Sequence, residues 1–383
     1  MKYKAFEDFY KESIIKHLIL IEYNGALISP PFCTENCRDY NTLLYIKNDI
    51  VSRIELDLPP ATSKFNGIAV INDSLWMIPY GIWDDFNIAV QLKFKDPIYH
   101  KISEFGKGQF YWLASNGKTG FSFPLGYEGT NFSLLIKDDQ IKTIPMDHSL
   151  YKKRHMGTVF CNSSYWSPPR SDTPGYCTLM EFDGLNFNEH ILNIPNPDIT
   201  RKYSDLIVDK KILYGLPFGE TEGLLNLFEF DTESKTYELI KLNIPDFKKK
   251  YNCSVLIEDT IIALPYGNEN EYNSNWGLTF NIKTKEYKIF DTGFSFGGKW
   301  RFRSGLNFNN NAVFFPTGTP SLPIVSYDKH GNKIYEKYLE DLLVGRPIEF
   351  QGYLFSIAYN LISHQHYLLR FDDHYKIDII SLS

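Results

Sequence analysis

The feature that most constrains the fold is a short apolar strand that ends in Pro-x-Gly and returns along the whole chain. In its clearest copy, Glu258–Gly267, a two-residue turn precedes the apolar run and the Pro-x-Gly stop. Related copies lie at 75–81, 121–126, 212–219 and 313–318, and weaker ones at 27–31, 165–169 and 354–360. The eight copies follow one another at steps of 42 to 51 residues. Self-similarity at this period is typical of repeat architectures such as propellers.

Each repeat contains four short apolar runs, which predict four strands. In the sixth repeat the runs are 254–257, 260–264, 277–282 and 286–290. Two residues separate the first pair and three separate the second, as in tight antiparallel hairpins. Four short antiparallel strands repeated radially form a propeller blade. The sequence therefore predicts an all-β fold, an eight-bladed β-propeller of four-stranded antiparallel blades. Seven blades with a divergent N-terminal region remain an alternative.

The ends of the chain predict how the ring closes. The propeller is expected to be one domain over residues 16–383, with each terminal blade built from its own strands and none lent across the seam. Residues 1–15 place Phe6, Phe9 and Ile14 at near-helical spacing, which predicts a short N-terminal helix. This helix either caps the first blade or binds a partner.

One pair of segments resembles a known repeat family. Lys64–Gly67, a Lys-aromatic pair before a strand, is followed by the strand Leu75–Tyr80. This arrangement is similar to that of kelch-like β-propeller repeats, and the resemblance covers most of the chain from residue 16 onward. Most repeats lack the paired glycines of a true kelch pattern. The resemblance therefore implies the architecture and carries no catalytic residue into this sequence.

Composition excludes several classes of partner. The formal net charge is −6, so the chain has no overall nucleic-acid footprint. No apolar stretch is long enough for a membrane helix, and the first residues lack the apolar core of a signal peptide. We therefore expect a cytoplasmic protein without a nucleic-acid or membrane partner.

No metal or cofactor is predicted. Cys33 and Cys37 share a loop at C-x3-C spacing, but no second pair or nearby histidine completes a zinc site. His364 and His366 alternate in an extended stretch and could face one metal, yet no third ligand is evident. These residues are expected to be free thiols and a polar loop.

A basic residue precedes the first strand of every repeat. The eight positions are Lys16, Lys64, Lys107, Arg154, Lys202, Lys250, Arg301 and Arg346. The first strand of a blade is the innermost, so such a base would project toward the axis. Eight cations around one opening would focus the field for an anion. The alternative is that these are ordinary solvated loop charges, some of them paired with acids.

These positions lead to the principal functional hypothesis. It is a binding module that presents a basic, aromatic-rich central funnel to an acidic glycan, a sugar phosphate or a protein partner. Arginines could grip a carboxylate bidentately, and aromatic rings would add flat faces for stacking. The candidate ligand-binding residues are Lys64, Arg154, Lys202, Tyr203, Lys250, Trp300, Arg301 and Arg346, with Trp83 and Trp276 from the loops between second and third strands.

An enzyme acting on an acidic sugar at the same funnel is the alternative. The chain has no nucleophile elbow, phosphate loop or His-Glu-x-x-His motif. His155 follows Arg154, and Tyr251 occupies the corresponding position in another repeat. A His/Tyr pair beside an arginine could move a proton next to a sugar carboxylate, as in a lyase, epimerase or hydrolase. His155 and Tyr251 are thus the candidate catalytic residues of this version.

Overall fold

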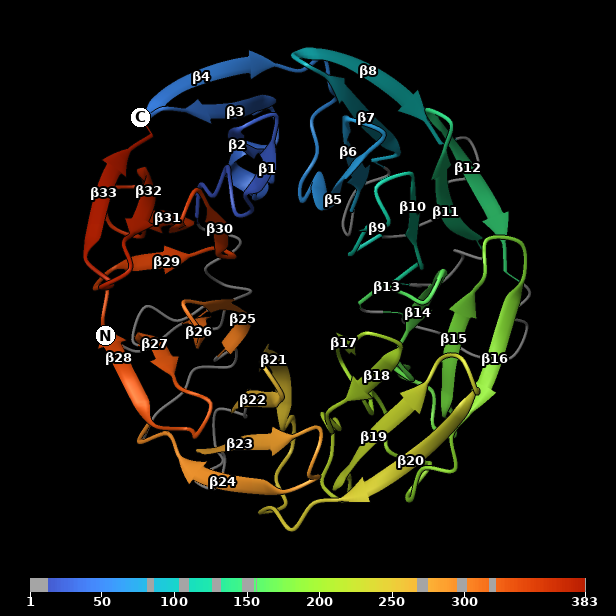
Figure 1. Cartoon of the computed structure of the whole chain (residues 1–383). Coiled ribbons are helices and arrows are strands. Elements are labelled where there is room, and N and C mark those ends of the chain that lie inside the picture. The colour runs from blue at the N-terminus through green and yellow to red at the C-terminus, as the bar shows by residue number, and fades with distance from the viewer. Residues whose placement is uncertain are drawn as a thin grey trace.

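The chain folds into a closed ring of eight antiparallel β-sheets (Figure 1). The computed structural model describes residues 13–80, 86–102, 110–125, 132–146, 155, 157–266, 275–294, 302–316 and 322–382. Each sheet comes from one sequence repeat, and the prediction of an all-β, eight-bladed propeller is confirmed. The seven-blade alternative is wrong, because the most divergent repeats, the first and the last, also form complete blades.

The first four blades follow the repeats in order. Blade one contains β1 (Ile21–Tyr23), β2 (Ala26–Ser29), β3 (Thr42–Lys47) and β4 (Ile50–Glu55). Blade two contains β5 (Phe65–Ile71), β6 (Ser74–Pro79), β7 (Ile88–Lys93) and β8 (Asp96–Lys101). Blade three contains β9 (Ala114–Ser115), β10 (Thr119–Ser122), β11 (Phe132–Lys137) and β12 (Gln140–Pro145). Blade four contains β13 (Val159–Cys161), β14 (Ser164–Ser167), β15 (Thr178–Phe182) and β16 (Phe187–Ile191).

The other four blades complete the circle. Blade five contains β17 (Ile207–Asp209), β18 (Ile212–Gly215), β19 (Asn226–Asp231) and β20 (Thr236–Lys241). Blade six contains β21 (Tyr251–Ile257), β22 (Thr260–Pro265), β23 (Trp276–Asn281) and β24 (Tyr287–Asp291). Blade seven contains β25 (Phe302–Phe308), β26 (Asn311–Pro316), β27 (Ile324–Tyr327) and β28 (Lys333–Lys337). Blade eight contains β29 (Leu342–Val344), β30 (Ile348–Phe350), β31 (Tyr353–Asn360), β32 (His366–Phe371) and β33 (Ile377–Ser381), with β29 and β30 both paired to β31.

Within each blade the chain runs from the centre of the ring to its perimeter (Figure 1). The second strand is the most apolar and the most buried; β6 and β22 are buried at every position. The outermost strands, such as β4, contain only exposed and half-buried residues. This gradient follows from geometry, because inner strands pack against neighbouring blades on both faces whereas the outermost strand meets solvent.

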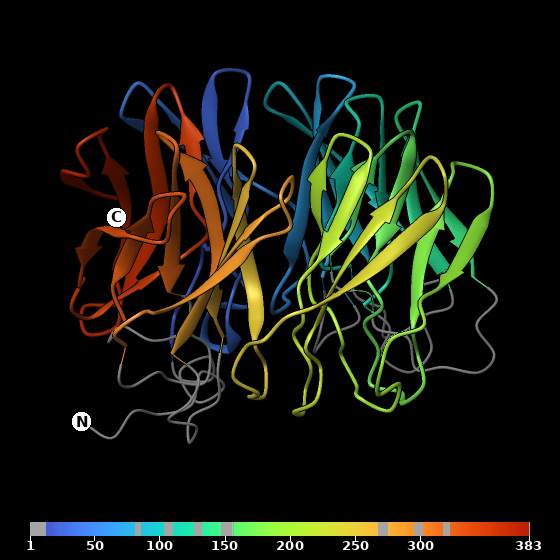
Figure 2. The same ribbon diagram turned by 60° about the horizontal axis from the view of Figure 1, so that its bottom comes forward.

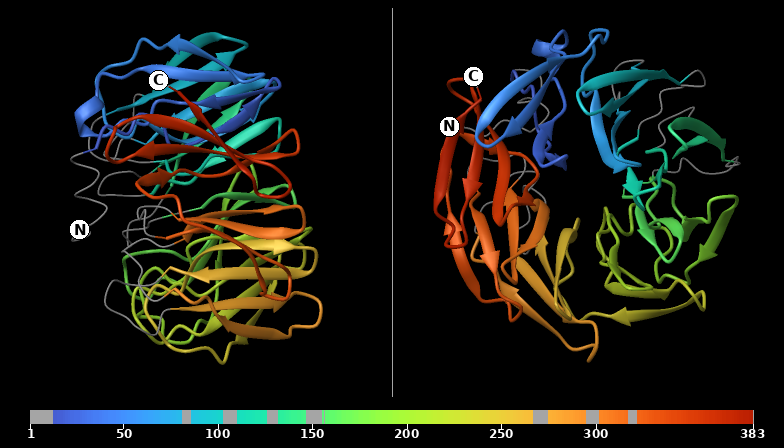
Figure 3. Two further views of the ribbon diagram at one scale, coloured as in Figure 1. Left: turned by 90° about the vertical axis from the view of Figure 1, so that its left-hand side faces the viewer. Right: turned by 45° about the horizontal axis from the view of Figure 1, so that its top comes forward.

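The connections divide between two faces of the ring. Because the strands are antiparallel, the turns from first to second strand share one face with the turns from third to fourth strand (Figure 2). The described connections between second and third strands, such as 30–41, 168–177 and 216–225, lie on the other face. Figure 3 shows the ring from the side and tilted.

Helical structure is almost absent from the part of the chain that the structure describes. A single turn of 3-10 helix, Glu35–Cys37, is the helix found there. No helix among those residues has the length and apolar character needed to cross a bilayer. The expected N-terminal helix falls largely on residues 1–12, outside the described residues, and residues 13–15 are not helical.

The ring closes by packing and side-chain contacts between blades one and eight. No strand is lent across the seam, since each terminal sheet contains only its own strands, as predicted. Arg370 pairs with Asp49 at 2.9 Å, and Arg53 donates to the carbonyl of Leu382 at 3.0 Å. Figure 1 shows β33 beside β4 at this seam.

Two buried histidines also join the seam. His17 donates from Nδ1 to the carbonyl of Pro30 at 3.1 Å and accepts from the Tyr40 hydroxyl at Nε2, 2.9 Å away. His366 accepts the backbone N–H of Lys16 at its Nε2, 3.0 Å away. The two rings meet edge to face with centroids 5.8 Å apart. His366 must be neutral to accept this N–H, and burial, which lowers the pKa of His17 to about 3, keeps that ring neutral as well.

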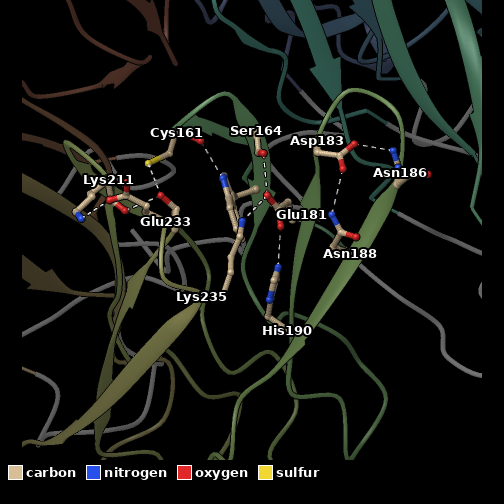
Figure 4. A network of polar contacts seen from close by, with 12 residues as sticks. Cys161, Ser164, Glu181, Asp183, Asn186, Asn188, His190, Lys211, Glu233 and Lys235 are labelled. Carbon is tan, nitrogen blue, oxygen red and sulfur yellow. Dashed lines mark hydrogen bonds and ion pairs between the residues drawn. The ribbon is translucent and has the colours of Figure 1, made fainter.

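Neighbouring blades are further joined by polar clamps near the outer strands. Glu181 in blade four is 3% exposed and accepts from Ser164, His190 and Lys235 at 2.7 to 2.8 Å (Figure 4). Lys235 belongs to blade five, where it also lies over the Trp166 ring at 4.5 Å. Burial alone would raise the pKa of Glu181, but the three donors outweigh it and hold the pKa below its ordinary value.

The variant Glu181→Gln is expected to lose about 2 kcal/mol of unfolding free energy, because three hydrogen bonds to a charged acceptor weaken while the side-chain shape is kept. Urea denaturation at neutral pH measures this loss. Glu238→Gln, on the exposed outer strand β20, is the matched control and should stay within about 0.5 kcal/mol of wild type. Equal stability of the two variants would show that the clamp contributes nothing.

Candidate functional site

The lysines that precede the first strands are buried in the scaffold. Lys64, Lys202 and Lys250 are 0 to 1% exposed. The ammonium of Lys64 donates to the carbonyls of Arg38 and Tyr40, and that of Lys202 to Tyr176 (2.9 Å) and Ile199 (2.6 Å). Their charges therefore do not face an open mouth, contrary to the sequence-based expectation.

Lys250 follows the same arrangement. Its ammonium donates to the carbonyl of Phe247 at 2.6 Å and pairs with Asp246 at 2.8 Å. Burial lowers the pKa of both Lys64 and Lys202, and the nearby thiols and acids raise it only in part. Three repeats thus use the base as an internal cross-link.

The backbone at this position joins consecutive blades. The N–H of Lys64 donates to the carbonyl of Phe32 in blade one, and its carbonyl accepts from Tyr80 in blade two. Lys250 makes the same two bonds with Phe218 of blade five and Tyr266 of blade six. Tyr80 and Tyr266 come directly after the second strand of their blade, and Phe32 and Phe218 come three residues after theirs. The recurrence of base and Pro-aromatic pair is explained by this relay of main-chain hydrogen bonds.

The aromatic residue after each base belongs to the blade core. Phe65, Tyr203, Tyr251 and Phe302 are 0 to 2% exposed. Tyr203 donates to the carbonyl of Asn226 at 2.9 Å and packs edge-on against Phe228. These rings fill the space between strands and are not presented for ligand stacking.

The residue that follows the aromatic ring occupies a β-bulge. In blade two, Phe65 lies opposite Pro79 and Gly67 opposite Ile78, so Asn66 is the extra residue. The same one-residue shift makes Asn252 the extra residue of blade six and Arg303 that of blade seven. Bulges re-aim side chains next to functional sites. In blades two and seven the bulge residue, Asn66 or Arg303, reaches the axis.

Arg346 has a comparable place in blade eight. Val344 lies opposite Ala358 but Ile348 lies opposite Phe355, so the strand gains one residue between them. Arg346 falls within this irregular stretch, where its N–H donates to the carbonyl of Leu18. It is the predicted ligand-binding residue that the structure places at the axis.

Two arginines and two aromatic rings meet at the centre of the ring. The Arg303 guanidinium lies over the Tyr111 ring at 5.2 Å. The Arg346 guanidinium lies 5.2 Å from the same ring and 4.0 Å from that of Trp112. Arg303 belongs to blade seven and Tyr111 to blade three, which face each other across the ring (Figure 1). A contact between opposite blades can form only on the axis.

Asn66 holds this cluster together. Its amide donates to the carbonyl of Tyr111 at 3.2 Å, and its Oδ1 accepts from Arg346 at 3.3 Å. Burial alone would raise the pKa of Tyr111, but the guanidiniums of Arg303 and Arg346 outweigh it and lower that pKa. The centre of the ring is therefore strongly electropositive.

Arg170 adds a third guanidinium from blade four. It is 5% exposed, and its Nε and Nη1 find no acceptor among the described residues. Its guanidinium lies 5.1 Å from the Phe218 ring. Burial and the nearby Arg201 lower its pKa to about 10, so it still carries its charge at neutral pH. Buried guanidinium nitrogens without acceptors are costly, so these two donors are suited to an anionic group.

One carboxylate faces these cations. Asp205, ahead of β17 in blade five, is accessible to solvent although it lies deep within the ring. Its Oδ1 accepts from its neighbour Leu206 at 2.8 Å. The surrounding protein raises its pKa to about 6, and Arg346 and Arg170 only partly offset this.

Five predicted ligand-binding residues remain. Arg154, Trp300, Arg301 and Trp83 lie outside the described residues. Trp276 is half-buried at the start of β23, the third strand of its blade.

His155 and Tyr251, the predicted catalytic pair, are each 2% exposed. His155 bonds to the Ser167 hydroxyl at 3.0 Å and packs on Phe123, and Tyr251 lies in the apolar core between blades five and six. Neither reaches the axis, so the acid–base role assigned to this pair is not supported by their positions.

The histidines and cysteines considered as metal ligands have other partners. His366 accepts from Lys16, and His364 bonds to the Tyr359 hydroxyl at 2.6 Å, so the two rings do not share a site. Cys33 donates to the carbonyl of Tyr40, and Cys37 to that of Ile15. Within the described ranges, no three His, Cys, Asp or Glu side chains come together as a metal site would require.

Comparisons with known proteins identify the architecture. No protein-family model matches the chain, and no curated protein matches it significantly. Solved structures with a similar fold include the dihydro-heme d1 dehydrogenase NirN in complex with DHE, at 10% identity and a TM-score of 0.61, covering 99% of this chain and 74% of that chain.

Two other structures are similar over a shorter range. An inactive virginiamycin B lyase from Staphylococcus aureus with quinupristin has 12% identity and a TM-score of 0.53, covering 77% and 92% of the two chains. The WD40 repeats of RRP9 have 8% identity and a TM-score of 0.50, covering 76% and 86%. At these identities the likeness shows the fold alone, and the chain is a β-propeller whose structural neighbours include enzymes and repeat modules.

Proposed function

We propose that this propeller binds a small anionic ligand, such as a sugar acid or sugar phosphate, on its axis. The observation that carries the proposal is the convergence of Arg170, Arg303 and Arg346 from three blades, with two guanidinium nitrogens of Arg170 buried and lacking an acceptor among the described residues. A carboxylate or phosphate supplies the acceptors that a guanidinium fork requires.

The surroundings suit a ligand with a flat or cyclic body. Trp112 is half-buried beside Arg346, and Tyr111 lies beneath both arginines. Aromatic faces next to charged donors combine apolar contact with orientation, which is typical of small-molecule sites. NirN and the virginiamycin B lyase were each solved with a bound small molecule, which fits a ligand role for this fold.

The test is calorimetric titration with glucose 6-phosphate, glucuronate and inorganic phosphate at low and high salt. Arg303→Gln and Arg346→Gln should each weaken binding about tenfold or more, since each removes a charge-assisted hydrogen bond. The salt dependence of binding should fall as well. The control is Lys118→Gln, which changes an exposed lysine in the turn between β9 and β10. This variant should bind as wild type does. Unchanged binding by both arginine variants would overturn the proposal.

A catalytic role is the second candidate. Asp205, with a pKa raised to about 6, and Tyr111, with a lowered pKa, are titratable groups on the axis. Perturbed groups of this kind cluster at active sites. Incubation with a glucuronate-containing oligosaccharide decides between the two: an enzyme forms a product that Asp205→Asn does not form, and a binding module leaves the oligosaccharide intact.

A platform for protein partners on the outer rim has less support. The two most exposed large apolar side chains among the described residues, Phe94 at 79% and Leu185 at 86%, lie in turns of different blades.

The proposed location is the cytoplasm, because Cys33, Cys37, Cys161, Cys177 and Cys253 are all buried free thiols, as expected in a reducing compartment. The resemblance to kelch-like repeats, in architecture only, stays part of the proposal and rests on Lys64 and Phe65 at the start of β5.

A further inference from the structure

Asp205 is an unusual residue in an anion site. It lies just ahead of β17 in blade five, and its carboxylate lies beside Gly157 of blade four. The backbone N–H of Leu206 is its hydrogen-bond donor, and no cation of the described residues forms an ion pair with it. The residue is exposed to solvent, and its hydrogen bond to Leu206 is made by Oδ1.

The charges on the axis are therefore arranged in two parts. Blades seven and eight supply Arg303 and Arg346, and blade four supplies Arg170. Blade five supplies the carboxylate of Asp205, within electrostatic reach of Arg346 and Arg170 but not paired with them. A simple anion on the arginines would be repelled by this carboxylate, and like charges at close range weaken binding.

We propose that the axial ligand is a zwitterion, an anion that also carries an amino group, with its phosphate or carboxylate on the arginines and its ammonium on Asp205. This inference rests on the proposed function. The ammonium of such a ligand would donate hydrogen bonds to the Asp205 carboxylate, so that the carboxylate attracts the ligand instead of repelling it. Amino-sugar phosphates and amino acids are the chemical classes that fit.

Close packing around Asp205 supports a built acceptor. Gly157 has a φ of +89°, and a Cβ at that residue would lie 3.2 Å from the Asp205 carboxylate oxygen. A side chain at this residue would therefore crowd Oδ1, the oxygen that accepts from Leu206.

The experiment compares matched probes that differ only by an amino group. The pairs are glucosamine 6-phosphate with glucose 6-phosphate, and glutamate with glutarate, each titrated calorimetrically above pH 7. Wild type should bind the amino member of a pair at least about tenfold more tightly, a preference typical of a charge-assisted contact. In Asp205→Asn this preference should disappear.

The preference of wild type separates the zwitterion from a plain anion, because Asp205→Asn should bind glucose 6-phosphate and glutarate more tightly in either case. If wild type binds the amino member of each pair no more tightly than its partner, or if Asp205→Asn keeps the preference, the inference is overturned and the proposed function stands. If neither member of any pair binds and the arginine variants behave as wild type, the proposed function itself fails. Asp209→Asn, at the other end of the same inner strand, is the matched control and should keep the preference of wild type.

Discussion

Lowering the pH from 7 to 5 is expected to reduce the free energy of unfolding by about 4 kcal/mol through two histidines at the ring seam. Burial lowers the pKa of His17 to about 3, with His366 and Lys16 adding to the effect. Burial and the Lys16 charge lower that of His366 to about 4. In the unfolded chain both pKa values return to about 6.5.

The direction of this effect follows from the depressed pKa values. Above pH 6.5 both histidines are neutral in either state, and their contribution to stability is constant. Below pH 6.5 the two histidines bind protons in the unfolded chain but not in the folded protein. The free energy of unfolding therefore falls until the pH reaches the folded pKa values near 3 and 4.

Urea denaturation at several pH values measures the effect. His366→Gln should be less stable than wild type at pH 7, because the contact with Lys16 changes. Its unfolding free energy should fall between pH 7 and pH 5 by only about half as much as that of wild type. His374→Gln, an exposed histidine, is the control and should keep the full difference. A wild-type stability that does not change between pH 7 and pH 5 would contradict this description of the seam.

Replacing Lys202 by methionine is expected to destabilise the fold by about 3 kcal/mol. The substitution keeps most of the apolar stem but removes the donor to the carbonyls of Tyr176 and Ile199, two buried acceptors. Each lost partner costs about 1 to 3 kcal/mol, and removal of a buried charge recovers part of that cost. Denaturation and ligand titration should be measured on the same samples.

The two measurements distinguish an internal lysine from a ligand-binding one. Lys202→Met should keep its affinity for glucose 6-phosphate at temperatures where it is folded, because the ammonium does not face the axis. Lys241→Met, on the exposed outer strand β20, should be as stable as wild type. A Lys202→Met protein of wild-type stability that has lost ligand affinity would restore the ligand-binding role predicted from the sequence.

The architecture could be predicted because its determinants are local. Each Pro-x-Gly stop lies at the end of a buried second strand, and each short turn between apolar runs forms a hairpin. These features need only a few neighbouring residues to be recognised, and they recur at a steady period. The blade count followed from the period, including blades one and eight, whose copies of the stop are the weakest.

The site could be predicted only in part because a β-bulge decides which residue faces the axis. In the triplet Arg301-Phe302-Arg303 the sequence drew attention to the first residue, whereas the bulge turns the third inward. A bulge depends on pairing with the next strand and leaves no regular pattern in a single sequence. Attention to the third position would have found Arg303 and Asn66 together.

Other site residues have no repeat to reveal them. Arg170 follows two prolines in a connection of blade four, and Tyr111 comes four residues after the base of its repeat, Lys107, rather than two. Their contacts join blades that are far apart in sequence, so they exist only once the ring is closed. Arg346 was recognised because its blade places the base itself in the irregular stretch.

The most direct test of an anion site on the axis is an anomalous diffraction experiment. Crystals grown without other oxyanions would be soaked in selenate, whose selenium marks each bound anion. We expect the strongest selenium peak within hydrogen-bonding distance of Arg170, Arg303 or Arg346, and no such peak in the double variant Arg303→Gln, Arg346→Gln. Selenium found only on surface lysines, with none between opposite blades, would contradict the assignment of this centre as a binding site.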